Sequence, residues 1–204
     1  MEPHAPTPRT RLFGAATIAA PVLLIASTTA YTAGDGLGED QVGGVIQVYA
    51  MVAFMLTVVG LTQMLENLSP RVAALLTLVG VLGVAGGVGY GINSIYADIG
   101  TIDLNDDVAG AAGPLALQLP GILFPLTFVG LGVALLRTHV QPRWCAVALV
   151  VAGVLFPLSR IPSVEILALA ADTVFLVALL PLGSAMLRGR DVVGRHALAA
   201  VVRS

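Results

Sequence analysis

Six long apolar stretches divide the chain, and they constrain its fold more than any other feature of the sequence. They cover residues 12–33, 42–65, 72–97, 114–136, 144–159 and 164–187. A helix needs about 20 apolar residues to cross the roughly 30 Å hydrocarbon core of a bilayer. Lipid offers no partner to an unpaired backbone N–H or C=O, so each stretch is predicted to be helical. The sequence therefore predicts an all-α, polytopic transmembrane bundle of about six spans.

The amino-acid composition is also typical of a chain that is surrounded by lipid. Hydrophobic residues make up 57% of the chain and charged residues only 11%, with a mean hydropathy of +0.93, whereas charged residues form about a quarter of a soluble domain. No polar linker separates two bundles, so residues 1–204 are predicted to form one integral membrane domain. Cys145 is the only cysteine, which excludes an intrachain disulfide and a cysteine-rich metal site.

The charged residues indicate the orientation. All ten basic residues are arginines; nine lie on one side of the predicted bundle, and only Arg160 lies on the other. That other side carries most of the acidic residues: Asp35, Glu39, Asp40, Asp98, Asp103, Asp106, Asp107 and Glu165. Cytoplasmic connections are enriched in arginine, so both termini and the tail 188–204 are predicted to be cytoplasmic, in the inner (plasma) membrane of a bacterium. A cleaved signal peptide is the alternative for the first span, with Thr28 and Ala30 at cleavage positions.

A short pattern occurs twice. Leu56, Thr57, Val59, Gly60 and Leu61 recur seventy positions later as Leu126, Thr127, Val129, Gly130 and Leu131. A Pro-Arg pair follows each copy, at Pro70 and at Pro142, where proline suits the first turn of the next helix. Spans two and three are therefore predicted to be a parallel copy of spans four and five, although short apolar segments also resemble one another by chance.

The third span is rich in glycine. Gly83, Gly87 and Gly91 are spaced four residues apart and share one helical face. Without side chains, this face lets another helix backbone approach closely. The pattern predicts tight helix packing, either inside the chain or at a homodimer seam.

Few polar side chains fall within the spans, and most lie in their outer halves. Asp172 is the only carboxylate well inside a span, and Asn93, Gln118, Gln47 and Tyr90 lie at similar depth. An ionisable residue at this depth is costly unless it faces a cavity or a partner, for which Arg160 is a candidate. The five residues are predicted to line an outward-facing polar pocket. The alternative is that they hydrogen-bond one another and fix the helix packing.

Motifs for known chemistry are missing from the sequence. His4, His139 and His196 lie outside the spans, so no histidine pair can hold haem iron within the membrane. The acidic loop with Asp103, Asp106 and Asp107 lacks EF-hand spacing, which favours a solvated loop over a Ca²⁺ or Mg²⁺ site. No catalytic residue, metal or cofactor is predicted.

The layout of the spans, the Pro-Arg turns and the glycine-rich third span resemble small uncharacterised multi-pass membrane proteins of high-GC, actinobacterial-type bacteria. This resemblance implies the membrane fold and no activity. Three functions stay open. The chain is predicted to bind or transport a small solute; the alternatives are an accessory or regulatory subunit and, less favoured, an enzyme acting on a lipid or isoprenoid. The predicted partners are the bilayer and a second copy or another membrane subunit, with no nucleic acid.

Overall fold

A computed structural model describes residues 6–34, 36–66, 68–100, 113–138 and 142–189. The regular structure in these ranges is entirely helical, in the order α1 (Pro8–Ala33), α2 (Gln41–Glu66), α3 (Pro70–Asp98), η2 (Pro114–Gln118), α4 (Leu119–Arg137), α5 (Arg143–Arg160) and α6 (Glu165–Leu187). Six helices are long and apolar enough to cross a membrane. The predicted all-α bundle of six spans is therefore confirmed. The first helix begins earlier than predicted, at Pro8, and the start of the predicted fourth span is the π-helical turn η2.

The helix starts follow local sequence signals. Thr7 caps α1 by accepting a hydrogen bond from the backbone N–H of Thr10 at 3.2 Å, and Pro8 occupies the first turn. Pro70 opens α3, as its position in the sequence predicts, whereas Pro142 lies one residue before α5. The wider π-helical turn η2 leads into α4, whose second residue is Pro120. Proline has no backbone N–H to donate, so it cannot make the regular bond there.

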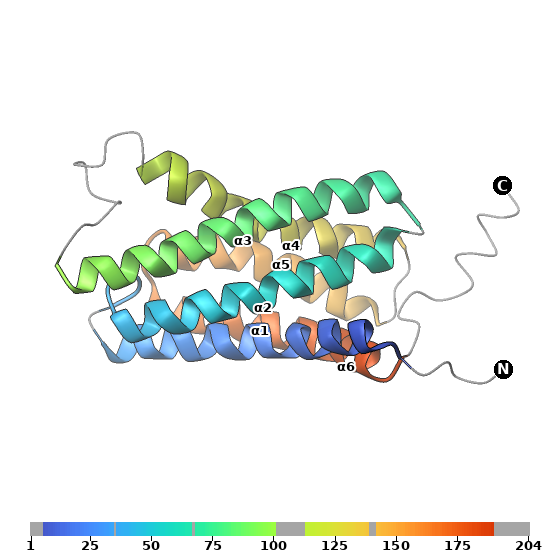
Figure 1. Ribbon diagram of the computed structural model, residues 1–204, viewed down its shortest axis with the longest axis horizontal. Helices are drawn as coiled ribbons and strands as arrows, with labels where there is room; N and C mark the ends of the chain where they lie inside the picture. Colours follow the sequence, from blue (N-terminus) through green and yellow to red (C-terminus); the bar gives the residue numbers. More distant parts are fainter. Residues whose placement is uncertain (1–5, 35, 67, 101–112, 139–141, 190–204) are drawn as a thin grey trace, which may run out of the picture.

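The six spans form a closed ring. Each packs against its neighbours in the chain, and α1 also packs against α6 (Figure 1). The start of α1 and the end of α6 lie at the same end of the bundle. Successive spans run in opposite directions, so with six of them α1 and α6 are antiparallel where they pack together.

Phenylalanines fill the centre of the ring. One cluster of ring contacts contains Phe54 of α2, Phe124 and Phe128 of α4, Phe156 of α5 and Phe175 of α6. Their ring centroids are 5.0 to 6.2 Å apart, and most pairs meet edge to face, the geometry that aromatic quadrupoles favour. Four helices thus share one aromatic core.

The glycine face of α3 packs inside the chain. A Cβ on Gly83 would collide with the backbone of Phe124 in α4, and a Cβ on Gly91 would lie 2.9 Å from the carbonyl oxygen of Gly44 in α2. At Gly87 the nearest atom would be the sulfur of Met51, also in α2, at 2.5 Å. The three glycines therefore let α3 approach α2 on one side and α4 on the other.

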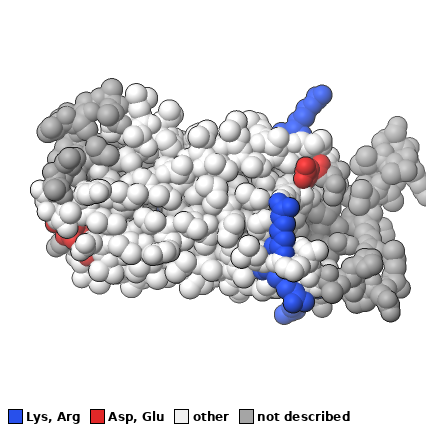
Figure 2. All heavy atoms as spheres, viewed as in Figure 1, with Lys and Arg blue, Asp and Glu red and all other residues white. Residues whose placement is uncertain are grey.

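Charged side chains gather at the two ends of the bundle and leave an uncharged band between them (Figure 2). The described arginines near the termini are Arg9, Arg11, Arg71, Arg137, Arg143 and Arg188, while Glu39, Asp40, Asp98, Arg160 and Glu165 lie at the other end. We call these the arginine-rich end and the acidic end. The band exposes large apolar side chains such as Leu78, Leu126 and Val151. This distribution supports a multi-pass membrane protein.

The two predicted repeat units form the hairpins α2–α3 and α4–α5. Thr57 and Thr127, which correspond in the repeat, both donate to the carbonyl oxygen four residues earlier, at 2.9 and 2.7 Å. Gly60 faces Phe13, whereas the corresponding Gly130 faces Leu76. The duplication of the hairpin stays a prediction.

Candidate functional site

The charged residues Asp172 and Arg160 lie at the contact of α1, α5 and α6. Asp172 is the eighth residue of α6, about 10 Å along the axis from its start at 1.5 Å per residue. Arg160 is the last residue of α5, and the connection of residues 161–164 returns the chain into α6. Because α5 and α6 are antiparallel and this turn is short, the long side chain of Arg160 can reach back along the bundle to the level of Asp172.

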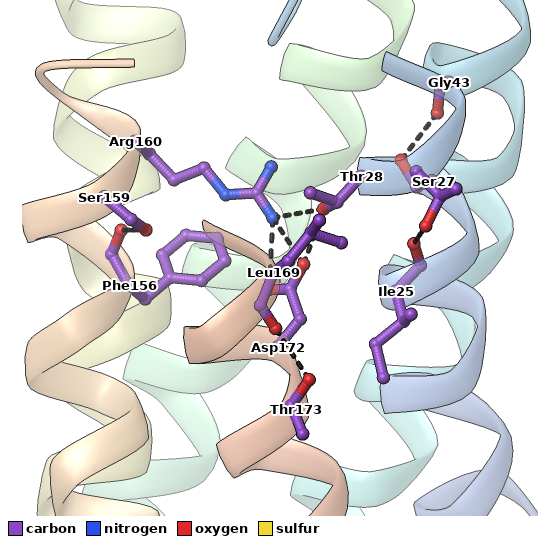
Figure 3. A network of polar contacts seen from close by, with 11 residues as sticks. Ile25, Ser27, Thr28, Gly43, Phe156, Ser159, Arg160, Leu169, Asp172 and Thr173 are labelled. Atoms are coloured by element: carbon purple, nitrogen blue, oxygen red, sulfur yellow. Dashed lines mark hydrogen bonds and ion pairs between the residues drawn. The ribbon is translucent and has the colours of Figure 1, made fainter. Parts of the chain in front are cut away.

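Three polar side chains there each contact the other two, and we call them the ion-pair centre: Thr28, Arg160 and Asp172 (Figure 3). Arg160 Nη2 lies 2.9 Å from Asp172 Oδ2 and 3.1 Å from Oδ1. Thr28 Oγ1 donates to Asp172 Oδ2 at 2.5 Å and accepts from Arg160 Nη2 at 2.7 Å. Each residue comes from a different helix, so the centre joins α1, α5 and α6.

The two charges differ in accessibility. Asp172 is fully buried, whereas the side chain of Arg160 is 18% exposed. The guanidinium Cζ lies 5.0 Å from the ring centroid of Phe156, close enough for a cation–π contact. All its polar bonds end on Nη2, and Nε is buried with no hydrogen-bond partner among the described residues. A buried donor without a partner is unusual and requires an explanation.

A second set of polar contacts holds α1, α2 and α3 together. Ser27, next to Thr28 in the chain, donates to the carbonyl oxygen of Gly43 in α2 at 2.7 Å. One turn later, the hydroxyl of Tyr31 donates to Ser94 Oγ of α3 at 3.0 Å. The half of α1 nearer the acidic end therefore carries polar contacts to α2 and α3 on one side and to α5 and α6 on the other.

The five residues of the predicted pocket lie on four helical elements: α2, α3, η2 and α6. Asp172 belongs to the ion-pair centre, while Gln47 of α2 donates through Nε2 to the carbonyl oxygen of Gly87 in α3 at 3.1 Å. Asn93 is buried in α3, and Tyr90 of the same helix is half-buried. Gln118 is exposed at the end of η2. The hydrogen bonds of Asp172 and Gln47 thus lead to different helices.

Arg160 was identified as a possible partner of Asp172 from the sequence, and the structure pairs them. The sequence does not predict the contacts of Thr28, which it marks only as a candidate signal-peptide cleavage position. The signal was present in the spacing of Ser27, Thr28 and Tyr31, which are polar residues within one turn of an apolar helix. The acidic loop with Asp103, Asp106 and Asp107 lies outside the described residues.

The ion-pair centre brings together a carboxylate, a hydroxyl and a guanidinium, which are groups that form charge-assisted hydrogen bonds. Within the described ranges, no three His, Cys, Asp or Glu side chains come together as metal ligands would. Comparisons with protein-family models, with curated proteins and with solved structures found no match. The functional argument therefore depends on the geometry of this centre.

Proposed function

We propose that this chain binds a small solute at the ion-pair centre, as a binding or transport protein of the membrane. The observation that carries the proposal is a charge pair inside an apolar bundle, of which one member is fully buried and the other partly exposed. Ionisable residues within spans are rare, and they commonly mark the paths of substrates, ions or protons.

Stability alone is a poor reason for such a pair. Placing one charged residue at the centre of a membrane helix costs about 2.5–3.5 kcal/mol on insertion scales. Buried ion pairs can often be replaced by well-packed apolar residues without loss of stability. The neighbours Ala168, Ala171 and Phe175 show that this part of α6 otherwise packs through apolar contacts. Because apolar residues could often fill such a place equally well, a ligand is the better explanation of the charge pair.

The proposed orientation has the arginine-rich end in the cytoplasm and the acidic end outside a bacterial inner membrane. Arg160 is the last residue of α5 at the acidic end, so a solute would enter from outside. The wider pocket predicted from the sequence, with Gln47, Asn93, Tyr90 and Gln118, stays a prediction. The present proposal requires only Thr28, Arg160 and Asp172.

A second candidate is an accessory or regulatory membrane subunit without activity of its own. It is favoured by the bonding of the polar side chains within the bundle, where Thr28, Ser27 and Tyr31 all have partners on other helices. In that case the ion-pair centre would only fix the packing of α1 against α5 and α6. The two candidates differ in whether water reaches the centre.

Cysteine labelling tests this difference with a matched pair of neighbours. Thr28 and Ser27 are both fully buried, but Thr28 belongs to the ion-pair centre, whereas Ser27 contacts α2. In a Cys145→Ala background, an impermeant thiol reagent added from outside should label Thr28→Cys faster than Ser27→Cys. Equal protection of both cysteines in a folded protein would reject the solute-binding proposal and favour the accessory subunit.

A further inference from the structure

The groups around the Arg160 guanidinium form a cradle that suits a cation. The carboxylate of Asp172 accepts from Nη2 with both oxygens, and Thr28 Oγ1 accepts from the same nitrogen. The aromatic face of Phe156 lies 5.0 Å from the guanidinium carbon. A carboxylate, a hydroxyl oxygen and an aromatic face are the groups that recognise ammonium and guanidinium ligands.

We propose that the solute is a small organic cation with N–H donors, of the guanidinium or primary ammonium class, and that Arg160 is a tethered occupant which this cation displaces. The inference rests on the proposed function and adds the chemical class of the solute. Thr28, Phe156 and Asp172 form the binding cradle, and the solute replaces the guanidinium of Arg160 in it.

The fit of Arg160 in the cradle is incomplete. Only Nη2 is bonded, and Nε is buried without a partner among the described residues. An arginine is held by its own backbone at the end of α5, so its guanidinium cannot turn freely to satisfy every donor. A free cation has no such tether and can orient its N–H groups toward the same oxygens.

Arg160 is also placed where it can leave. It is the last residue of its helix and its side chain is 18% exposed, whereas Asp172 below it is fully buried. Once the guanidinium moves out toward the acidic end, it can be solvated, and its place beside Asp172 becomes available. The pair therefore has two arrangements, one with Arg160 bonded to Asp172 and one with Arg160 moved out toward the acidic end. A cation that binds Asp172 favours the second arrangement.

The surrounding charge favours cations over anions. Glu39, Asp98 and Glu165 are exposed at the acidic end, and the only described basic residue there is Arg160 itself. Exposed charges of one sign raise the concentration of oppositely charged solutes near that surface. An anion would meet this repulsion and would then compete with Asp172 for Arg160.

Thermal unfolding in neutral detergent tests the proposal with simple probes: methylguanidinium, tetramethylammonium and acetate at equal ionic strength. Methylguanidinium should raise the melting temperature of the native protein more than tetramethylammonium, which has the charge but no N–H donor. Arg160→Gln removes the tethered competitor, so methylguanidinium no longer has to break the charged hydrogen bonds of Arg160 before it binds. The half-saturating methylguanidinium concentration should fall by about tenfold or more, which corresponds to the free energy of one charged hydrogen bond. Arg137→Gln, at the exposed end of α4, is the matched control and should leave it unchanged.

Two further variants test the cradle itself. Asp172→Asn should abolish the response to methylguanidinium, and Thr28→Val, which keeps the shape of the side chain, should weaken it about tenfold. The Thr28 variant keeps the test decisive if the Asp172 variant does not fold. Equal responses to methylguanidinium and tetramethylammonium, or a response that survives both variants, would overturn the inference.

The outcomes also separate this inference from the proposed function. Stabilisation by acetate that depends on Arg160 would overturn the cation class but leave solute binding at the centre intact. The same holds if Thr28→Cys is labelled from outside and no cation stabilises the protein. Protection of Thr28→Cys together with no response to any probe would reject both.

Discussion

Gly14 of α1 and Gly183 of α6 touch backbone to backbone where the first and the last helix cross. A Cβ on either glycine would lie 2.8 Å from the carbonyl oxygen of the other. This approach is closer than any side chain permits, and it lies toward the arginine-rich end of the bundle. The ion-pair centre joins the same two helices at the acidic end through Thr28 and Asp172. The ring of six helices is thus closed between α1 and α6 by a glycine contact at the arginine-rich end and by a hydrogen bond at the acidic end.

Gly183→Ala should destabilise the protein by about 1–3 kcal/mol, the usual cost of overpacking. The added methyl group would meet the backbone of α1, which cannot move without shifting the helix. Gly121→Ala in α4 is the control, because a Cβ there would meet nothing within 4 Å. It should be neutral or stabilise by up to about 1 kcal/mol through the higher helix propensity of alanine. Equal unfolding midpoints for the two variants in detergent would contradict the close contact.

The glycines of α3 should differ among themselves. Gly83→Ala would place its methyl against the backbone of Phe124, whereas Gly87→Ala would meet the flexible side chain of Met51. We expect Gly83→Ala to lower the melting temperature more than Gly87→Ala, because methionine can change rotamer and a helix backbone cannot. Gly87→Leu should exceed the space that Met51 can release, and disrupt the fold. A larger effect of Gly87→Ala than of Gly83→Ala would show that the backbone contact with α4 is absent.

The spans could be predicted from the sequence because the length of an apolar run is a local property. The sixth span, predicted as 164–187, is helical over Glu165–Leu187, and the second, predicted as 42–65, covers Gln41–Glu66. The ring of helix contacts could not be predicted in this way. In lipid the outward face of a helix is as apolar as its inward face, so the sequence does not mark which side meets a neighbour.

The ion-pair centre was predictable only in part. Asp172 and Arg160 are 12 residues apart across one short turn, so their charge and their common side of the bundle suggested the pair. Thr28 lies 132 residues before Arg160, and only the closure of α1 against α6 brings it near. Gln47 and Asn93 are predicted to lie at the same depth in the membrane as Asp172. The depth of a residue does not show which neighbouring helix its side chain contacts.

The orientation of the bundle can be tested with two described positions. Ser69 precedes α3 at the arginine-rich end, and Glu39 precedes α2 at the acidic end. In intact cells with Cys145 replaced by alanine, an impermeant thiol reagent should label Glu39→Cys and leave Ser69→Cys unlabelled until the membrane is permeabilised. Labelling of Ser69→Cys in intact cells would reverse the proposed sidedness. Asp106 and His139, in two further connections, lie outside the described residues.

The last prediction concerns the energetic coupling of Arg160 and Asp172. Asp172→Leu alone should destabilise by about 1–3 kcal/mol, because it leaves the buried Thr28 hydroxyl without its acceptor and removes the counter-charge of the partly exposed Arg160. Arg160→Met alone should also destabilise, since it strands a fully buried carboxylate. The double variant removes both charges and fills the site with apolar groups, so it should be more stable than either single variant.

The double-mutant cycle is measured by chemical unfolding of the native protein, the two single variants and the double variant in the same detergent. Asp172→Asn is added as a variant that keeps the shape of the side chain. The Asn variant should unfold between the native protein and Asp172→Leu, because its amide oxygen can still accept from Arg160 and Thr28. Additive effects of the two single substitutions would show that the charges are not coupled. In that case neither the ion-pair centre nor the exchange of Arg160 for a cation could stand, since both require that Asp172 hold the guanidinium.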